Sequence, residues 1–95
     1  SHKKMKTIKI KIFGDVQGVN FRHEAKKEAD ELGLKGFAEN LPDGSVYIEA
    51  EGEDENLERI LKWCYTGPET AKVFKTESKI SEEIADCDYP DFSIR

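Results

Sequence analysis

The segment from Gly14 to Arg22 contains the residues best suited to chemistry. Gly14 and Gly18 permit backbone conformations that are closed to other residues, so several consecutive N–H groups can turn toward one point. The segment precedes an expected helix, whose first turn leaves further N–H donors unpaired and adds positive potential. A phosphate group fits such a nest of donors. Arg22 lies about one residue into that helix, where its planar guanidinium can donate two parallel hydrogen bonds to phosphate oxygens.

Composition alone leaves a simpler interpretation open. A loop with two glycines before a helix usually serves only as a connection. Arg22 would then be a surface arginine that pairs with Glu24 or Glu28. The elements around the loop therefore matter for its interpretation.

The order of the expected elements defines a fold class. Ile8, Ile10 and Ile12 alternate with lysines, which predicts a strand with one buried face. Similar patterns, with a Pro and Asp-Gly turn signal at 41–44, predict strands at 7–13, 35–39, 45–51, 71–80 and 92–95. Apolar stripes with a glycine or an acidic first turn at their ends predict two helices, one from Phe21 to Gly33 and one from Glu53 to Gly67. This order predicts an α+β, ferredoxin-like βαββαβ sandwich, with an antiparallel sheet and two helices on one face.

Length and charge restrict the function classes. With 95 residues the chain is expected to form one domain at 7–95, and residues 1–6 are expected to be disordered or tag-derived, because Ser1 and His2 precede Met5. The net charge of −5 disfavours nucleic acid as a partner. No apolar run is long enough to span a membrane, and no secretory signal is recognisable, so a soluble, cytoplasmic monomer is expected. Two cysteines, Cys64 and Cys87, predict reduced thiols, although one bridge stays open at this point.

Two blocks of sequence carry a family resemblance. Phe13-Gly14-Asp15-Val16-Gln17-Gly18-Val19-Asn20-Phe21-Arg22 closely resembles the first signature of the acylphosphatase family. Gly36-Phe37-Ala38-Glu39-Asn40-Leu41-Pro42-Asp43-Gly44-Ser45-Val46 resembles the second. The segments after the second helix and at 88–94 are also similar to the family, so the resemblance spans nearly the whole chain. It implies the same ferredoxin-like fold that the periodicity predicts.

The resemblance implies an activity and roles for individual residues. It implies a metal-independent hydrolase, without a cofactor, that cleaves acyl phosphates to carboxylate and inorganic phosphate, the phosphate also being a competitive inhibitor. An arginine matching Arg22 and loop amides matching Val16, Gln17, Gly18, Val19 and Asn20 bind the phosphate in the family, and an asparagine matching Asn40 positions the attacking water. Without the resemblance, Asn40 would be interpreted as an ordinary strand-end residue. Three residues depart from the family pattern. Asn20 stands where the family often has glycine or an aromatic residue, and Glu39 stands where a basic or neutral residue is more usual. Glu69 stands where the family more often has a second proline after Pro68.

Other chemistries have weaker support. Asp86-Cys87-Asp88 mimics the aspartate pair of phospho-aspartate phosphatases, but Pro90 replaces the expected threonine or valine. Six residues after Cys64 is Thr70, not the arginine of a cysteine-dependent phosphatase. His23 has no cysteine at metal-site spacing, and a surface or cap role is expected for it. Two further classes stay open, a binding module within a larger maturation protein and an RNA-binding domain, although the negative charge and the lack of exposed strand aromatics disfavour RNA.

Overall fold

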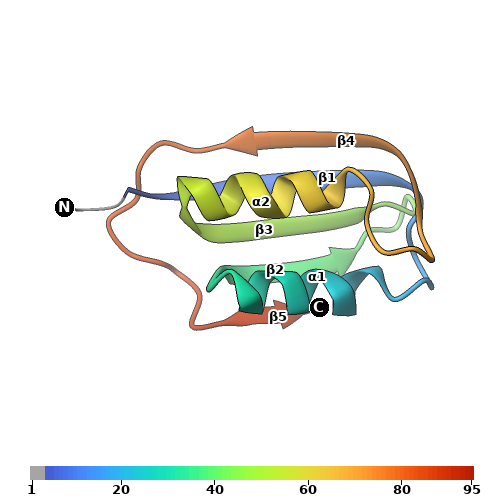
Figure 1. Ribbon diagram of the computed structural model, residues 1–95, viewed down its shortest axis with the longest axis horizontal. Coiled ribbons are helices and arrows are strands. Elements are labelled where there is room, and N and C mark those ends of the chain that lie inside the picture. Colours follow the sequence, from blue (N-terminus) through green and yellow to red (C-terminus); the bar gives the residue numbers. More distant parts are fainter. Residues whose placement is uncertain (1–3) are drawn as a thin grey trace.

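The computed structural model describes residues 4–95 as two helices on one face of a five-stranded sheet (Figure 1). The strand order across the sheet is β4-β1-β3-β2-β5. Helix α2 lies over β1 and β3, and α1 lies over β2 and β5 (Figure 1). The elements are β1 (Met5–Asp15), α1 (Phe21–Glu31), β2 (Lys35–Asn40), β3 (Val46–Glu53), α2 (Asp54–Cys64), β4 (Lys72–Ile80) and β5 (Phe92–Ile94).

The predicted ferredoxin-like α+β fold is confirmed, and one part of its description is wrong. Strands β1 to β4 pair antiparallel, but β5 runs parallel to β2, so the sheet is mixed. The chain leaves β4 at one edge of the sheet and reaches β5 at the other edge, beside β2, through residues 81–91. The N–H of Gly36 donates to the carbonyl of Asp91, and the N–H of Arg95 donates to the carbonyl of Ala38. These bonds fix the short β5 beside β2 and in the same direction.

The first strand begins earlier than the sequence indicated. Met5 pairs with Glu53, and Lys6 pairs with Gly52. These two residues were expected in the terminal segment 1–6 but belong to the sheet. The Lys6 ammonium also forms an ion pair with Asp54, with 3.1 Å between nitrogen and oxygen. Residues 1–3 of that segment lie outside the described residues.

The core lies between the sheet and the two helices. Ile8, Ile10 and Ile12 are fully buried, as their alternation predicted. They meet helix stripes made by Phe21, Ala25, Ala29, Leu57, Ile60 and Cys64. Burying one such isoleucine contributes roughly 1.5–3 kcal/mol. Cys64 is buried and Cys87 partly buried, and the two are not bonded to each other in the structure.

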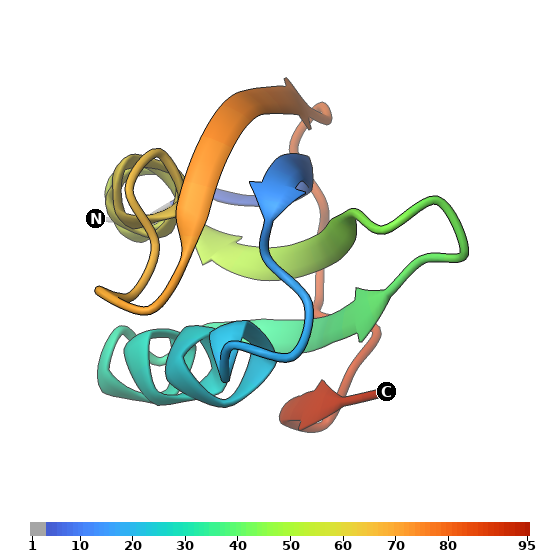
Figure 2. The same ribbon diagram turned by 90° about the vertical axis from the view of Figure 1, so that its right-hand side faces the viewer.

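Three of the connections between helices and strands lie at one end of the sheet. Figure 2 looks onto this end, where the loop 16–20 lies between the hairpin turn 41–45 on the right and the connection 65–71 on the left. The first joins β1 to α1, the second joins β2 to β3, and the third joins α2 to β4. None of the helices within residues 4–95 is long and apolar enough to cross a membrane.

Candidate active site

The loop between β1 and α1 is anchored by its valines. Val16 is buried and Val19 packs against the core, whereas Gln17, Gly18 and Asn20 are exposed. Gly18 has a φ of 75° and Asn20 a φ of 66°, both in the left-handed region. Asparagine is one of the few residues other than glycine that enters this region without a large cost. The departure at Asn20 from the family pattern therefore keeps the backbone conformation that a glycine would allow.

The amides of this loop are left without protein partners. Within residues 4–95, no hydrogen bond is found from the backbone N–H groups of Val16 to Asn20. The first bond of α1 is donated by Glu24 to the carbonyl of Asn20, so the preceding N–H groups of the helix are also free of intrahelical partners. Backbone donors that lack internal partners are satisfied by water or by a ligand. Left-handed residues in a short loop form a concave nest that suits an anion.

Arg22 is held by Arg95, the residue that follows β5. Its Nη1 donates a hydrogen bond of 2.7 Å to the backbone oxygen of Arg95. Arg95 is itself tied to β2 through Ala38, and its guanidinium lies 3.8 Å from the ring centroid of Phe37. One arm of the Arg22 fork is thus used for orientation, and the remaining donors are available to a ligand.

Asn40 is the last residue of β2 and lines the same cavity as the loop. A cavity of about 270 Å³ is lined by Arg22, Asn40, His23 and, from the loop and helix start, Val16, Gly18, Asn20 and Phe21. The structure thus brings together Arg22, Asn40 and three of the five loop residues that the resemblance implied. Gln17 and Val19 do not line this cavity, although both belong to the same loop.

Two side-chain contacts of the loop were not anticipated. Nε2 of Gln17 donates to the carbonyls of Leu41 and Ser45, at 2.7 and 2.9 Å. The hydroxyl of Thr70 donates to the carbonyl of Val19 at 2.6 Å. The partners are separated by 24, 28 and 51 residues, and no local sequence signal indicates contacts at that distance.

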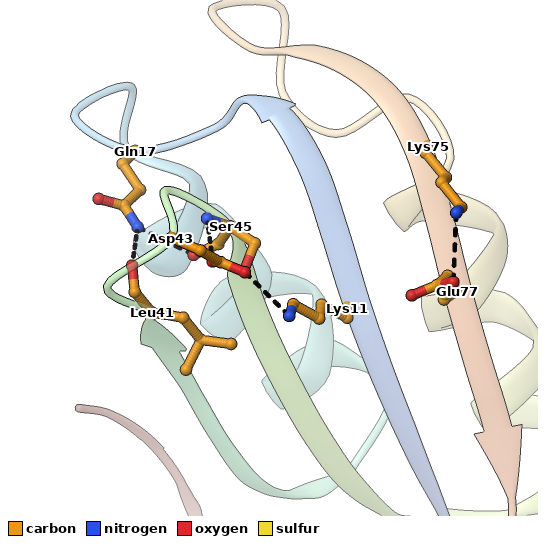
Figure 3. A network of polar contacts seen from close by, with 7 residues as sticks. All are labelled: Lys11, Gln17, Leu41, Asp43, Ser45, Lys75 and Glu77. Carbon is orange, nitrogen blue, oxygen red and sulfur yellow. Dashed lines mark hydrogen bonds and ion pairs between the residues drawn. The ribbon is translucent and has the colours of Figure 1, made fainter.

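The hairpin turn beside Asn40 is organised by Asp43. Its carboxylate accepts hydrogen bonds from the hydroxyl and the backbone N–H of Ser45, and its second oxygen lies 2.9 Å from Nζ of Lys11 (Figure 3). The hydrogen bond from the Ser45 hydroxyl and the neighbouring Lys11 ammonium lower the pKa of Asp43 well below its usual range.

The alternative chemistries find no support in the described residues. His23 is exposed, as expected, and lies at the rim of the cavity. Burial raises the pKa of the Cys64 thiol, which makes it a poor nucleophile. Trp63 packs edge-on against Phe21, with 5.1 Å between ring centroids, so its ring contributes to packing beside the core. Within residues 4–95, no three His, Cys, Asp or Glu side chains are grouped to hold a metal ion.

The fold and this cavity define a class, a ferredoxin-like domain whose loop between the first strand and the first helix presents unpartnered amides beside a cavity. The acylphosphatase family model matches residues 8–94. An acylphosphatase from Methylococcus capsulatus is 39% identical over 90 residues, covering 95% of this chain and 96% of its relative. The chain therefore belongs to the acylphosphatase family, whose members are hydrolases of acyl phosphates and need no metal.

Solved structures agree with this assignment. An acylphosphatase from Coxiella burnetii superposes with a TM-score of 0.86 at 36% identity, covering 100% of this chain and 99% of the other. Part of full-length HypF, crystallised in a phosphate- and nucleotide-bound form, is also similar, with a TM-score of 0.85 and 29% identity. The match covers 100% of this chain but only 12% of HypF.

Proposed function

We propose that Arg22 and the backbone amides of Val16 to Asn20 bind the phosphoryl group of an acyl phosphate, and that Asn40 orients the attacking water. The observation that carries this proposal is the shared cavity, in which Arg22 and Asn40 lie with unpartnered loop amides. An acyl phosphate carries its negative charge on the phosphoryl oxygens, which match a site made of N–H donors and one guanidinium.

In the proposed reaction, a water oxygen attacks phosphorus while the bond from phosphorus to the bridging oxygen breaks. The electron pair of that bond leaves with the carboxylate. A phosphoryl oxygen of the substrate accepts the proton of the water, so inorganic phosphate and a carboxylate are the products. Positioning and electrostatic stabilisation supply most of the catalysis in phosphoryl transfer, so no phosphorylated side chain is required.

The first experiment measures hydrolysis of benzoyl phosphate with and without EDTA. Turnover is expected to continue in the chelator, and inorganic phosphate is expected to compete with substrate. Activity that disappears with EDTA and returns with a divalent ion would overturn the proposed site. A steep loss of kcat in His23→Gln, with unchanged phosphate inhibition, would instead assign the proton to His23.

The second experiment separates Arg22 from Asn40. Arg22→Ala is expected to weaken phosphate binding by about 10-fold or more, because a hydrogen bond to a charged group contributes about 1.5–3 kcal/mol. It is also expected to lower kcat, and Arg22→Lys should not rescue either value, since a point charge cannot reproduce the fork. Asn40→Ala should leave the phosphate inhibition constant nearly unchanged and lower kcat by about 10²-fold, as expected for a lost transition-state donor.

A matched control tests whether these effects are local. Arg59 is an exposed arginine on α2 that pairs with Glu55, away from the cavity, so Arg59→Ala should keep wild-type kinetics. Thermal melts establish that each variant is folded. An Asn40→Ala protein with wild-type kcat would remove the water-orienting role even if the enzyme hydrolyses benzoyl phosphate.

We also propose that this protein acts as a cytoplasmic monomer, as one domain from 7 to 95 extended at its start by Met5 and Lys6. The acidic net charge of −5 supports a small-molecule substrate rather than a nucleic-acid partner, and no membrane partner is proposed. Light scattering of the purified protein tests the monomer.

The alternative of a binding module is disfavoured by the pair of Arg22 and Asn40, and absence of benzoyl phosphate turnover would revive it.

A further inference from the structure

The candidate site is assembled from two strands that are not neighbours. The phosphate loop follows β1, whereas Asn40 ends β2, and β3 lies between them in the sheet. Adjacent strands are about 4.8 Å apart, so the two strand ends are separated by roughly 10 Å. In-line attack requires the water on Asn40 and the phosphorus in the loop to keep a fixed separation within a fraction of an ångström. The sheet alone does not set that separation, because both segments continue beyond their strands.

The side chain of Gln17 spans this gap. Its Nε2 donates one hydrogen bond to the carbonyl of Leu41 and one to the carbonyl of Ser45, at 2.7 and 2.9 Å. Figure 3 shows the Gln17 side chain extending to the turn, with its contact to Leu41 dashed. Because carbonyl oxygens only accept, the amide must present its NH₂ group to the turn, and this fixes its orientation. A neutral amide is the side chain that places two donors on one nitrogen without adding charge to the loop.

The turn that Gln17 grips is internally closed, so it moves as a unit with Asn40. The N–H of Leu41 donates to the carbonyl of Ser45, and the N–H of Gly44 donates to the carbonyl of Leu41. Asp43 joins the same turn to Lys11 of β1. The Asp43 side chain is about half exposed, and the ion pair joins the turn to β1 rather than to the loop 16–20. It therefore does not fix the distance between Asn40 and the loop.

We propose that Gln17 is a positioning residue that holds Asn40 at its working distance from the phosphate loop. This inference rests on the proposed function, because it acts through the water that Asn40 orients. The backbone amide of residue 17 stays in place when its side chain is changed, so phosphate binding and water positioning can be separated at this residue.

The test compares kcat with the inhibition constant of inorganic phosphate in Gln17→Leu and Gln17→Glu. Gln17→Leu removes the donors, and Gln17→Glu places a carboxylate of equal length against two carbonyls. Each is expected to lower kcat about 10-fold or more, the equivalent of one lost hydrogen bond, while the phosphate constant changes less than about 3-fold. In Gln17→Glu the deficit relative to wild type should shrink as the pH falls through the ordinary glutamate pKa of about 4.3, since the protonated group regains one donor.

A double-mutant cycle decides whether the effect runs through Asn40. In the Asn40→Ala background, Gln17→Leu should cause no further loss of kcat. Lys11→Met is the matched control, because it removes the ion pair to Asp43 but leaves the bonds between Asp43 and Ser45 and both contacts of Gln17, so it should keep kcat within about 2-fold. A second readout needs no turnover: the side-chain NH₂ resonances of Asn40 in protein saturated with inorganic phosphate should shift or broaden in Gln17→Leu and not in Lys11→Met.

The outcomes distinguish this inference from the proposed function. If the wild-type protein fails to hydrolyse benzoyl phosphate, the proposed function falls. If the wild-type protein is active but the losses in kcat from Gln17→Leu and Asn40→Ala simply add, Gln17 does not act through Asn40. If the inhibition constant of phosphate rises in proportion to the fall in kcat, the Gln17 side chain acts only on phosphate binding by the loop, and its positioning role is overturned.

Discussion

Replacing Gly18 with alanine tests the backbone geometry of the loop 16–20, which is proposed to bind phosphate, at an exposed residue. A Cβ built at Gly18 meets no atom within 4 Å, so alanine fits without any clash. The φ of 75° is the only obstacle, and a left-handed conformation costs an ordinary residue about 1–2 kcal/mol. The entire destabilisation therefore comes from backbone strain.

That cost converts into a measurable shift of the melting temperature. Unfolding entropy near the midpoint is about 2.1 cal/mol/K per residue, or roughly 0.2 kcal/mol/K for a domain of this size. A loss of 1–2 kcal/mol then lowers Tm by about 5–10 °C. A loop that relaxes to relieve the strain also turns its amides away from the anion, so the inhibition constant of phosphate should rise several-fold.

Two variants serve as controls for this reasoning. Gly18→Asn should lose less stability than Gly18→Ala, because asparagine enters the left-handed region more readily, as Asn20 does two residues later. Gly14→Ala should lose far more, because its Cβ would lie 2.1 Å from the backbone oxygen of Lys72 in β4.

The measurements are calorimetry for Tm and inhibition of benzoyl phosphate hydrolysis for phosphate affinity. Equal melting temperatures for wild type, Gly18→Ala and Gly18→Asn would refute the left-handed conformation at this position. A 5–10 °C loss of Tm with unchanged phosphate affinity would instead show that the amides around residue 18 do not bind the anion.

Two further predictions concern the groups that hold the site from outside. Thr70→Val removes the hydroxyl that donates to the carbonyl of Val19. Because this C=O and the N–H of Asn20 belong to one planar peptide and point in opposite directions, the N–H of Asn20 then loses its fixed orientation. Phosphate inhibition should therefore weaken about 3- to 10-fold at nearly constant kcat. A Thr70→Val enzyme with wild-type phosphate inhibition would contradict this role. Because the pKa of Asp43 lies below its ordinary value of 3.8, its ionised form stabilises the fold above that pH and loses this contribution as the pH falls below it. Urea unfolding of wild type and Asp43→Asn should therefore differ at pH 6 and converge toward pH 2, and a constant difference over that range would show that the carboxylate charge is not involved.

Sequence patterns predicted the sheet and helices well where a periodic face is buried. Ile8, Ile10 and Ile12 identify β1 because every second side chain enters the core. The beginning of β1 was placed late because Met5 and Lys6 follow a run of lysines, and only pairing with the end of β3 makes them part of a strand. The direction of β5 could not be predicted, since three residues carry no periodicity and its orientation depends on where the preceding connection crosses the molecule.

Residues of the candidate site likewise differ in how far local sequence predicts them. A glycine-containing loop before a helix can expose its amides through local backbone conformation, so the segment from Gly14 to Arg22 could be singled out from the sequence as a candidate anion site. The family resemblance was needed to assign phosphate binding to the amides of Val16 to Asn20 and to Arg22. Asn40 needed the family resemblance, because nothing local distinguishes it from an ordinary strand-end residue. The contacts of Gln17 and Thr70 depend on segments 24 to 51 residues away, and chain separation contains no information about distance across a folded sheet. The groups proposed to bind the anion thus lie close together in the sequence, whereas the groups proposed to set distances within the site are brought there by topology, and the structure is required to find them.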